Sequence, residues 1–87
     1  MSLIGLASKC GVTSSSLQDL INGNVRVGIS TKLGLTTSSL QTFLNGGTSI
    51  GLASKIGITS SSLQLLRNQI GQEGAVGLII GLLIKEN

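Results

Sequence analysis

Apolar residues recur along this chain at helical spacing, in short segments separated by glycines and hydroxyl residues. In the first segment Leu3, Leu6, Ala7 and Cys10 fall at i, i+3, i+4 and i+7, which is the spacing of one face of an α-helix. The same pattern predicts a first helix in each of three places: from Leu3 to Cys10, from Val27 to Leu33 and from Ser49 to Ile56. A glycine follows each helix, where a left-handed C-cap residue is expected: Gly11, Gly34 and Gly57.

A second apolar stripe follows each of these glycines. Its members are Leu17, Leu20 and Ile21, then Leu40, Phe43 and Leu44, then Leu63, Leu66 and Ile70. A threonine precedes each stripe and is well placed as the N-cap of a second helix: Thr13, Thr36 and Thr59. The sequence also allows the second helix to begin two residues later, with Ser15 and Gln18 forming a capping box. Asn-Gly pairs at 22–23 and 45–46 should end two of these helices, whereas Asn68 is followed by Gln69, so the third should run further.

These segments form a repeat of 23 residues. The stretch from Gly5 to Gln18 recurs from Gly28 to Gln41 and from Gly51 to Gln64, and the third copy matches the first at 12 of 14 positions. We therefore predict a single all-α domain over 1–87, in which short helical hairpins stack as a small solenoid. Its units are residues 5–27, 28–50 and 51–73, followed by an apolar segment, 74–87. The Asn-Gly pairs and β-branched residues leave a β-solenoid as an alternative.

The segment 74–87 loses the polar positions of the repeat and is almost wholly apolar. If it is helical, its three glycines lie on one side, where a backbone can approach closely. One interpretation is a buried helix that closes the array. The other is a contact with a second molecule, because a terminal cap usually has a polar outer face. The residues of that assembly interface would be Leu78, Ile79, Leu82 and Leu83, with Gly74, Gly77 and Gly81.

The charge content favours self-association. Only 10% of the residues are charged, with six basic against three acidic, whereas ordinary soluble domains have about 25%. A small free monomer usually keeps an abundantly charged surface. We therefore predict a structural protein that assembles with copies of itself into a filament or tube, by contacts that do not close.

The residue types argue against catalysis. The chain has no His, so neither Cys10 nor any serine has an imidazole to activate it. Cys10 takes the place that Leu33 and Ile56 hold in the other repeats, which predicts a core residue. No phosphate-binding loop or metal-ligand cluster is found in the sequence. We expect no enzyme, cofactor, metal or small-molecule substrate.

Membrane insertion is not predicted. Residues 1–3 offer no basic region of a conventional signal peptide, which leaves the cytoplasm or a non-classical export route. The apolar run 75–84 is too short to span a bilayer. A membrane-active protein remains the least favoured class, because the basic residues are scattered rather than gathered on one amphipathic face.

Each repeat also resembles the helix-turn-helix of Cro- and repressor-type DNA-binding domains. The third copy has the matching residues Leu52, Ala53, Ile56, Gly57, Ile58, Leu63 and Leu66, and the first has Leu6, Ala7, Cys10, Gly11, Val12, Leu17 and Leu20. The second copy departs from the pattern at Ser30. The resemblance implies that the second helix of each unit enters the major groove. DNA binding by tandem units is therefore the alternative function, with contacts from Lys9, Lys32, Lys55, Gln18, Gln41, Gln64 and Arg67.

Overall fold

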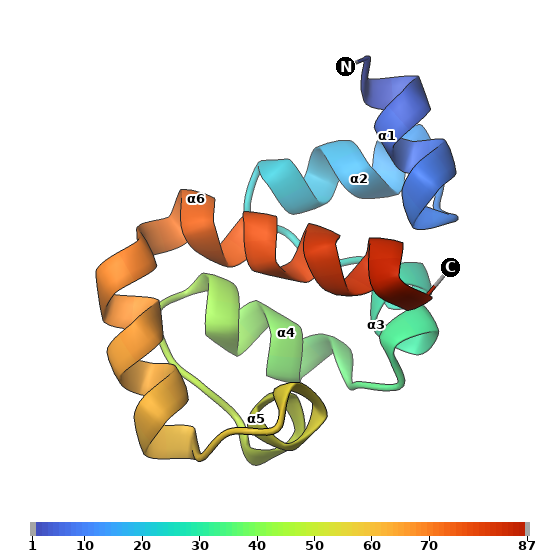
Figure 1. The fold of residues 1–87 in the computed structure, drawn as a ribbon. Coiled ribbons are helices and arrows are strands. Elements are labelled where there is room, and N and C mark those ends of the chain that lie inside the picture. Colours follow the sequence, from blue (N-terminus) through green and yellow to red (C-terminus); the bar gives the residue numbers. More distant parts are fainter. Residues whose placement is uncertain (1, 87) are drawn as a thin grey trace.

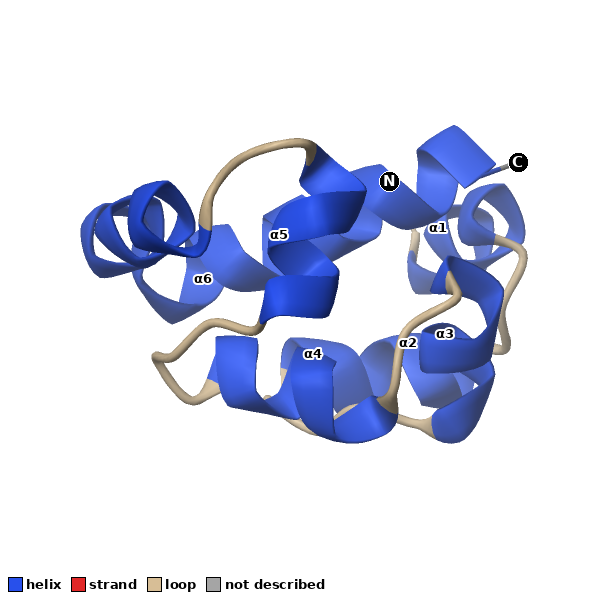
Figure 2. Cartoon of the chain, turned by 90° about the horizontal axis from the view of Figure 1, so that it is seen from below, coloured by secondary structure: helices blue, strands red, loops and turns tan. Residues whose placement is uncertain are grey.

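The computed structural model describes residues 2–86, which form helices joined by short loops (Figures 1 and 2). The six helices are α1 (Leu3–Cys10), α2 (Ser14–Ile21), α3 (Val27–Leu33), α4 (Thr37–Leu44), α5 (Ile50–Ile56) and α6 (Ser60–Glu86). The predicted all-α class is confirmed. The β-solenoid alternative is wrong, since residues 2–86 contain no strand.

The helix boundaries follow the predicted capping residues. The hydroxyls of Thr13 and Thr36 each accept a hydrogen bond from a backbone N–H three residues on, at 3.1 Å. Thr59 caps α6 in the same way, also at 3.1 Å. The threonine frame is therefore confirmed, and the frame with Ser15 and Gln18 as a capping box is wrong. The glycines that end α1, α3 and α5 all have left-handed backbone conformations, as predicted: Gly11, Gly34 and Gly57.

Helix α6 runs past the repeat and then bends sharply. As expected, it continues beyond Asn68, but Gly71 interrupts it with φ 67° and ψ −173°. This backbone region is almost restricted to glycine. The helix therefore consists of two parts, residues 60–70 and residues 72–86, and we call the second part the returning segment. In Figure 1 this segment (orange to red) runs back between α2 and α4.

The returning segment closes the hydrophobic core. Helix α6 contacts all five other helices, so it holds the helical hairpins of the three repeats together. The buried side chains of the returning segment are Ala75, Val76, Ile79 and Leu83. They pack with the buried apolar residues of every repeat: Ala7, Cys10, Leu17, Leu20, Ile29, Leu33, Leu40, Phe43, Leu44, Leu52, Ala53 and Leu63.

Candidate functional site

One large aliphatic side chain per repeat is exposed at the start of α1, α3 and α5. These are Ile4, Val27 and Ile50, with exposed fractions of 72%, 69% and 77%. They are 23 residues apart, so the repeat places the same apolar group at the same point of each unit. They lie outside the apolar stripes that predict the helices and were therefore not among the predicted site residues. The recurrence of an aliphatic residue at this one position of the repeat is the sequence feature that could have identified them.

The interface predicted in the C-terminal segment is only partly on the surface. Ile79 and Leu83 are completely buried in the chain's own core, so they are not available to a neighbour in this conformation. Leu78 and Leu82 are half-buried against that core.

The three glycines of this predicted interface differ in their surroundings. Gly77 and Gly81 are exposed, and a Cβ added at either would meet no atom within 4 Å. At Gly74 an added Cβ would clash with the side chain of Ile70. Of these three glycines, Gly74 is therefore the one whose missing side chain allows a neighbouring side chain to pack closely.

The glutamines considered for DNA contact join consecutive repeats. The Nε2 atom of Gln41 donates to the carbonyl of Gly23 at 2.8 Å, and its Oε1 accepts from the backbone N–H of Val25 at 3.0 Å. Gln64 repeats the first of these bonds one unit later, with the carbonyl of Gly46 at 2.9 Å. Gln18, in the first repeat, donates to the Oδ1 atom of Asn22 and makes no bond of this kind with the described residues. The recurrence of this glutamine therefore has a structural cause.

Arg67 is also used inside the molecule. It is only 8% exposed, and its guanidinium donates to the carbonyls of Phe43 at 2.6 Å and Leu44 at 3.0 Å. It also lies over the Phe43 ring, 5.9 Å from its centroid. Arg67 thus caps the C-terminus of α4, where a cation is favoured by the helix dipole.

The three repeated lysines lie in the last turns of α1, α3 and α5, which is also a favourable position for a cation: Lys9, Lys32 and Lys55. Their surroundings differ. Lys9 is exposed and Lys32 is half-buried. The Nζ atom of Lys55 lies 2.6 Å from the Oε1 atom of Glu86 and ties the end of α6 to α5. This ammonium holds the pKa of Glu86 below its ordinary value.

The serine and threonine clusters mainly cap helices. Thr13 and Ser16 also bond through their side chains at 2.8 Å, and the equivalent pair in each later repeat does the same. Ser30, the departure from the helix-turn-helix pattern, is buried and bonded to the carbonyl of Val27 and the hydroxyl of Thr37, both at 2.9 Å.

The remaining chemistry of the described residues is sparse. Cys10 is completely buried, and this burial raises the pKa of its thiol, so the thiol stays protonated at neutral pH. Among residues 2–86 there is no group of three or more His, Cys, Asp or Glu side chains that could hold a metal ion. Within the same part of the chain, no helix has the length and apolarity to cross a membrane.

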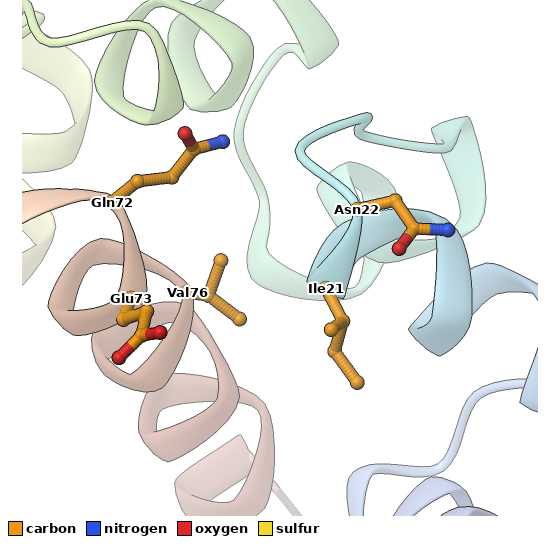
Figure 3. Close-up of a pocket in the computed structure, with 5 residues that line it drawn as sticks. All are labelled: Ile21, Asn22, Gln72, Glu73 and Val76. Atoms are coloured by element: carbon orange, nitrogen blue, oxygen red, sulfur yellow. The ribbon is translucent and has the colours of Figure 1, made fainter.

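A pocket of about 460 Å³ opens where α2 ends and the returning segment begins (Figure 3). Ile21 and Val76 form its apolar wall, and Asn22, Gln72 and Glu73 supply polar groups. The carboxylate of Glu73 makes no ion pair or hydrogen bond with any described residue. No sequence pattern predicts this pocket, because it forms where the returning segment meets the first repeat.

The chain matches no protein-family model, no curated protein and no solved structure. The chain's own geometry must therefore carry any functional proposal.

Proposed function

We propose that this protein is a structural protein whose copies associate into a homopolymeric filament or tube. The observation that carries the proposal is the recurrence of an exposed aliphatic side chain at one position of every repeat: Ile4, Val27 and Ile50. A single exposed aliphatic residue is ordinary on a protein surface. Three equivalent ones, each more than two-thirds exposed in a chain with 10% charged residues, favour a surface that is covered by another molecule.

The magnitudes favour a contact that uses several of these positions. Burying one Val or Ile side chain contributes roughly 1.5–3 kcal/mol. Association costs roughly 4–15 kcal/mol in lost translational and rotational freedom. Burying one aliphatic group is therefore not enough to offset this cost, whereas three equivalent groups contribute roughly 4.5–9 kcal/mol, which lies in the lower half of that range. A stable assembly then needs additional contacts.

The remaining charges would give little resistance to such an assembly. Arg26 is paired with Asp19, Lys55 with Glu86, and Arg67 is buried against α4. Few charges remain that would have to be stripped of water or would repel a second copy.

DNA binding has weaker support from the same geometry. Phosphate neutralisation by Lys and Arg supplies much of the affinity for DNA. Arg67 is committed to two carbonyls of α4, and Gln41 and Gln64 to the loops of preceding repeats. These three residues would have to give up intramolecular bonds to contact a duplex.

The proposal is tested by replacing Ile4, Val27 and Ile50 together with Gln, a polar residue with good helix propensity. Electron microscopy and light scattering should show fibres for the unmodified protein and none for this variant at the same concentration. The matched control carries Gln at three other exposed positions of the same helices, again 23 residues apart, and should assemble normally: Ser8, Thr31 and Ser54.

Two results would count against the proposal. One is fibre formation by the triple aliphatic variant that equals that of the control. The other is an unmodified protein that stays monomeric and retards a DNA duplex, which would favour the helix-turn-helix alternative.

A further inference from the structure

The C-termini of α2 and α4 occupy equivalent places in the repeat but are capped differently. At the end of α4, the guanidinium of Arg67 donates to the carbonyls of Phe43 and Leu44. The residues 23 positions earlier are Leu20 and Ile21, at the end of α2. No described side chain donates to the carbonyl of Ile21. The two equivalent helix ends thus differ: the Arg67 guanidinium bonds to the last carbonyls of α4, whereas near the end of α2 the guanidinium of Arg26 pairs with the Asp19 side chain.

The end of α2 lines the pocket beside the returning segment. Figure 3 shows Ile21 and Asn22 on one side of the pocket, and Gln72, Glu73 and Val76 on the other. Glu73 adds a carboxylate on the side of the pocket opposite the C-terminus of α2, which itself carries partial negative charge. Ile21 and Val76 provide an apolar wall. This combination suits an alkylammonium side chain, which has an apolar stem and a cationic tip.

The chain itself carries a suitable cation at the other end of the returning segment. The side chain of Lys85 is exposed and forms no salt bridge or hydrogen bond with any described residue, and its charge acts only at longer range on the neighbouring Glu86. Its neighbour Ile84 is 41% exposed. The helical span from Glu73 to Lys85 is about 18 Å at 1.5 Å per residue. Lys85 therefore lies too far from the pocket to fill it within the same molecule.

We propose that the pocket at the end of α2 receives Lys85 from a second copy of this chain. The ammonium would lie between the Glu73 carboxylate and the Ile21 carbonyl, with Ile84 against Ile21 and Val76. This inference rests on the proposed self-assembly and names one of its contacts. Because donor and acceptor lie at opposite ends of the returning segment (Figure 1), the contact is head-to-tail. Such a heterologous contact extends into a filament when the rotation between copies does not close a ring.

A charge-exchange experiment tests this contact. The variants Glu73→Lys and Lys85→Glu each place two like charges at the joint, and each should raise the concentration needed for assembly by about tenfold or more. The double variant should assemble like the unmodified protein. An equimolar mixture of the two single variants should also assemble, because each supplies the charge that the other lacks. Gln69→Lys, an exposed change on α6 outside the pocket, controls for the added positive charge.

The possible outcomes separate this contact from the proposed function. If the unmodified protein forms filaments and both single variants do so equally well, the pocket has some other occupant and the contact is wrong, while self-assembly stands. If the unmodified protein forms no filament, self-assembly fails and the contact fails with it. Loss of filament assembly in both single variants, without recovery of assembly in the mixture or in the double variant, would also overturn the pairing of Glu73 with Lys85.

Discussion

The side chain of Gln41 bonds to the backbone of Gly23, 18 residues earlier, at the loop that ends the preceding repeat. The same bond recurs between Gln64 and Gly46. A residue type that favours DNA contact in a helix-turn-helix is therefore used here to join neighbouring units. The bond explains why glutamine recurs at this position of the repeat without any appeal to a nucleic acid.

Replacing Gln41 with Leu should destabilise the fold by about 1–3 kcal/mol, because it leaves the part-buried Gly23 carbonyl and Val25 N–H without their partners. Urea denaturation followed by circular dichroism measures this change. Gln18→Leu is the matched control and should be close to neutral, since the side chain of Gln18 bonds, among the described residues, to the exposed Asn22 alone. Equal losses of stability in the two variants would show that the bond from Gln41 to the preceding repeat does not stabilise the fold.

Replacing Arg67 with Met should cost about 1–3 kcal/mol, since the side-chain volume is kept but the carbonyls of Phe43 and Leu44 lose a charged donor. Arg67→Lys should recover only part of the loss, because an ammonium lacks the planar fork that reaches both carbonyls. The free energy of unfolding in urea is again the measurement. A Met variant as stable as the unmodified protein would show that the cap contributes nothing.

Two glycines of α6 should respond to alanine with opposite signs. Gly71→Ala should destabilise by about 1–3 kcal/mol, because φ 67° with ψ −173° is strained for any residue with a Cβ. Gly77→Ala should stabilise by about 0.5–1 kcal/mol, because this exposed helical position has open space around it. Thermal unfolding of both variants, compared with that of the unmodified protein, measures the two changes in stability. A stabilising Gly71→Ala would mean that α6 does not bend there.

The thiol of Cys10 should react with a disulfide reagent only when the protein unfolds, because it is completely buried and its pKa is raised by burial. The reaction rate measured against urea concentration should follow the unfolding curve. Rapid reaction of the folded protein would contradict the burial of this residue.

The parts of the fold that depend on near neighbours were predictable from the sequence. The apolar spacing and the glycine caps predict the bounds of α1 and α3 as observed, and the threonine caps predict where α2, α4 and α6 begin. Helix α5 begins one residue later than expected because Ser49 is its N-cap. These features depend on bonds within a few residues, which a sequence pattern represents well.

The parts that depend on the path of the returning segment were not predictable. Ile79 and Leu83 have the same apolar character as Leu78 and Leu82, and only the bend at Gly71 decides which of them face the core. The pocket beside Glu73 likewise requires residues 72–76 to meet the end of α2. The bonds of Gln41 and Arg67 span 18 and 24 residues, so no local pattern reveals them.

Sedimentation velocity of the unmodified protein over a wide range of concentrations tests self-assembly most directly. Self-assembly should give a boundary that shifts to large, growing species as concentration rises, and long polymers by electron microscopy of the same samples. A single species with the mass of one 8.8 kDa chain at every concentration would contradict it.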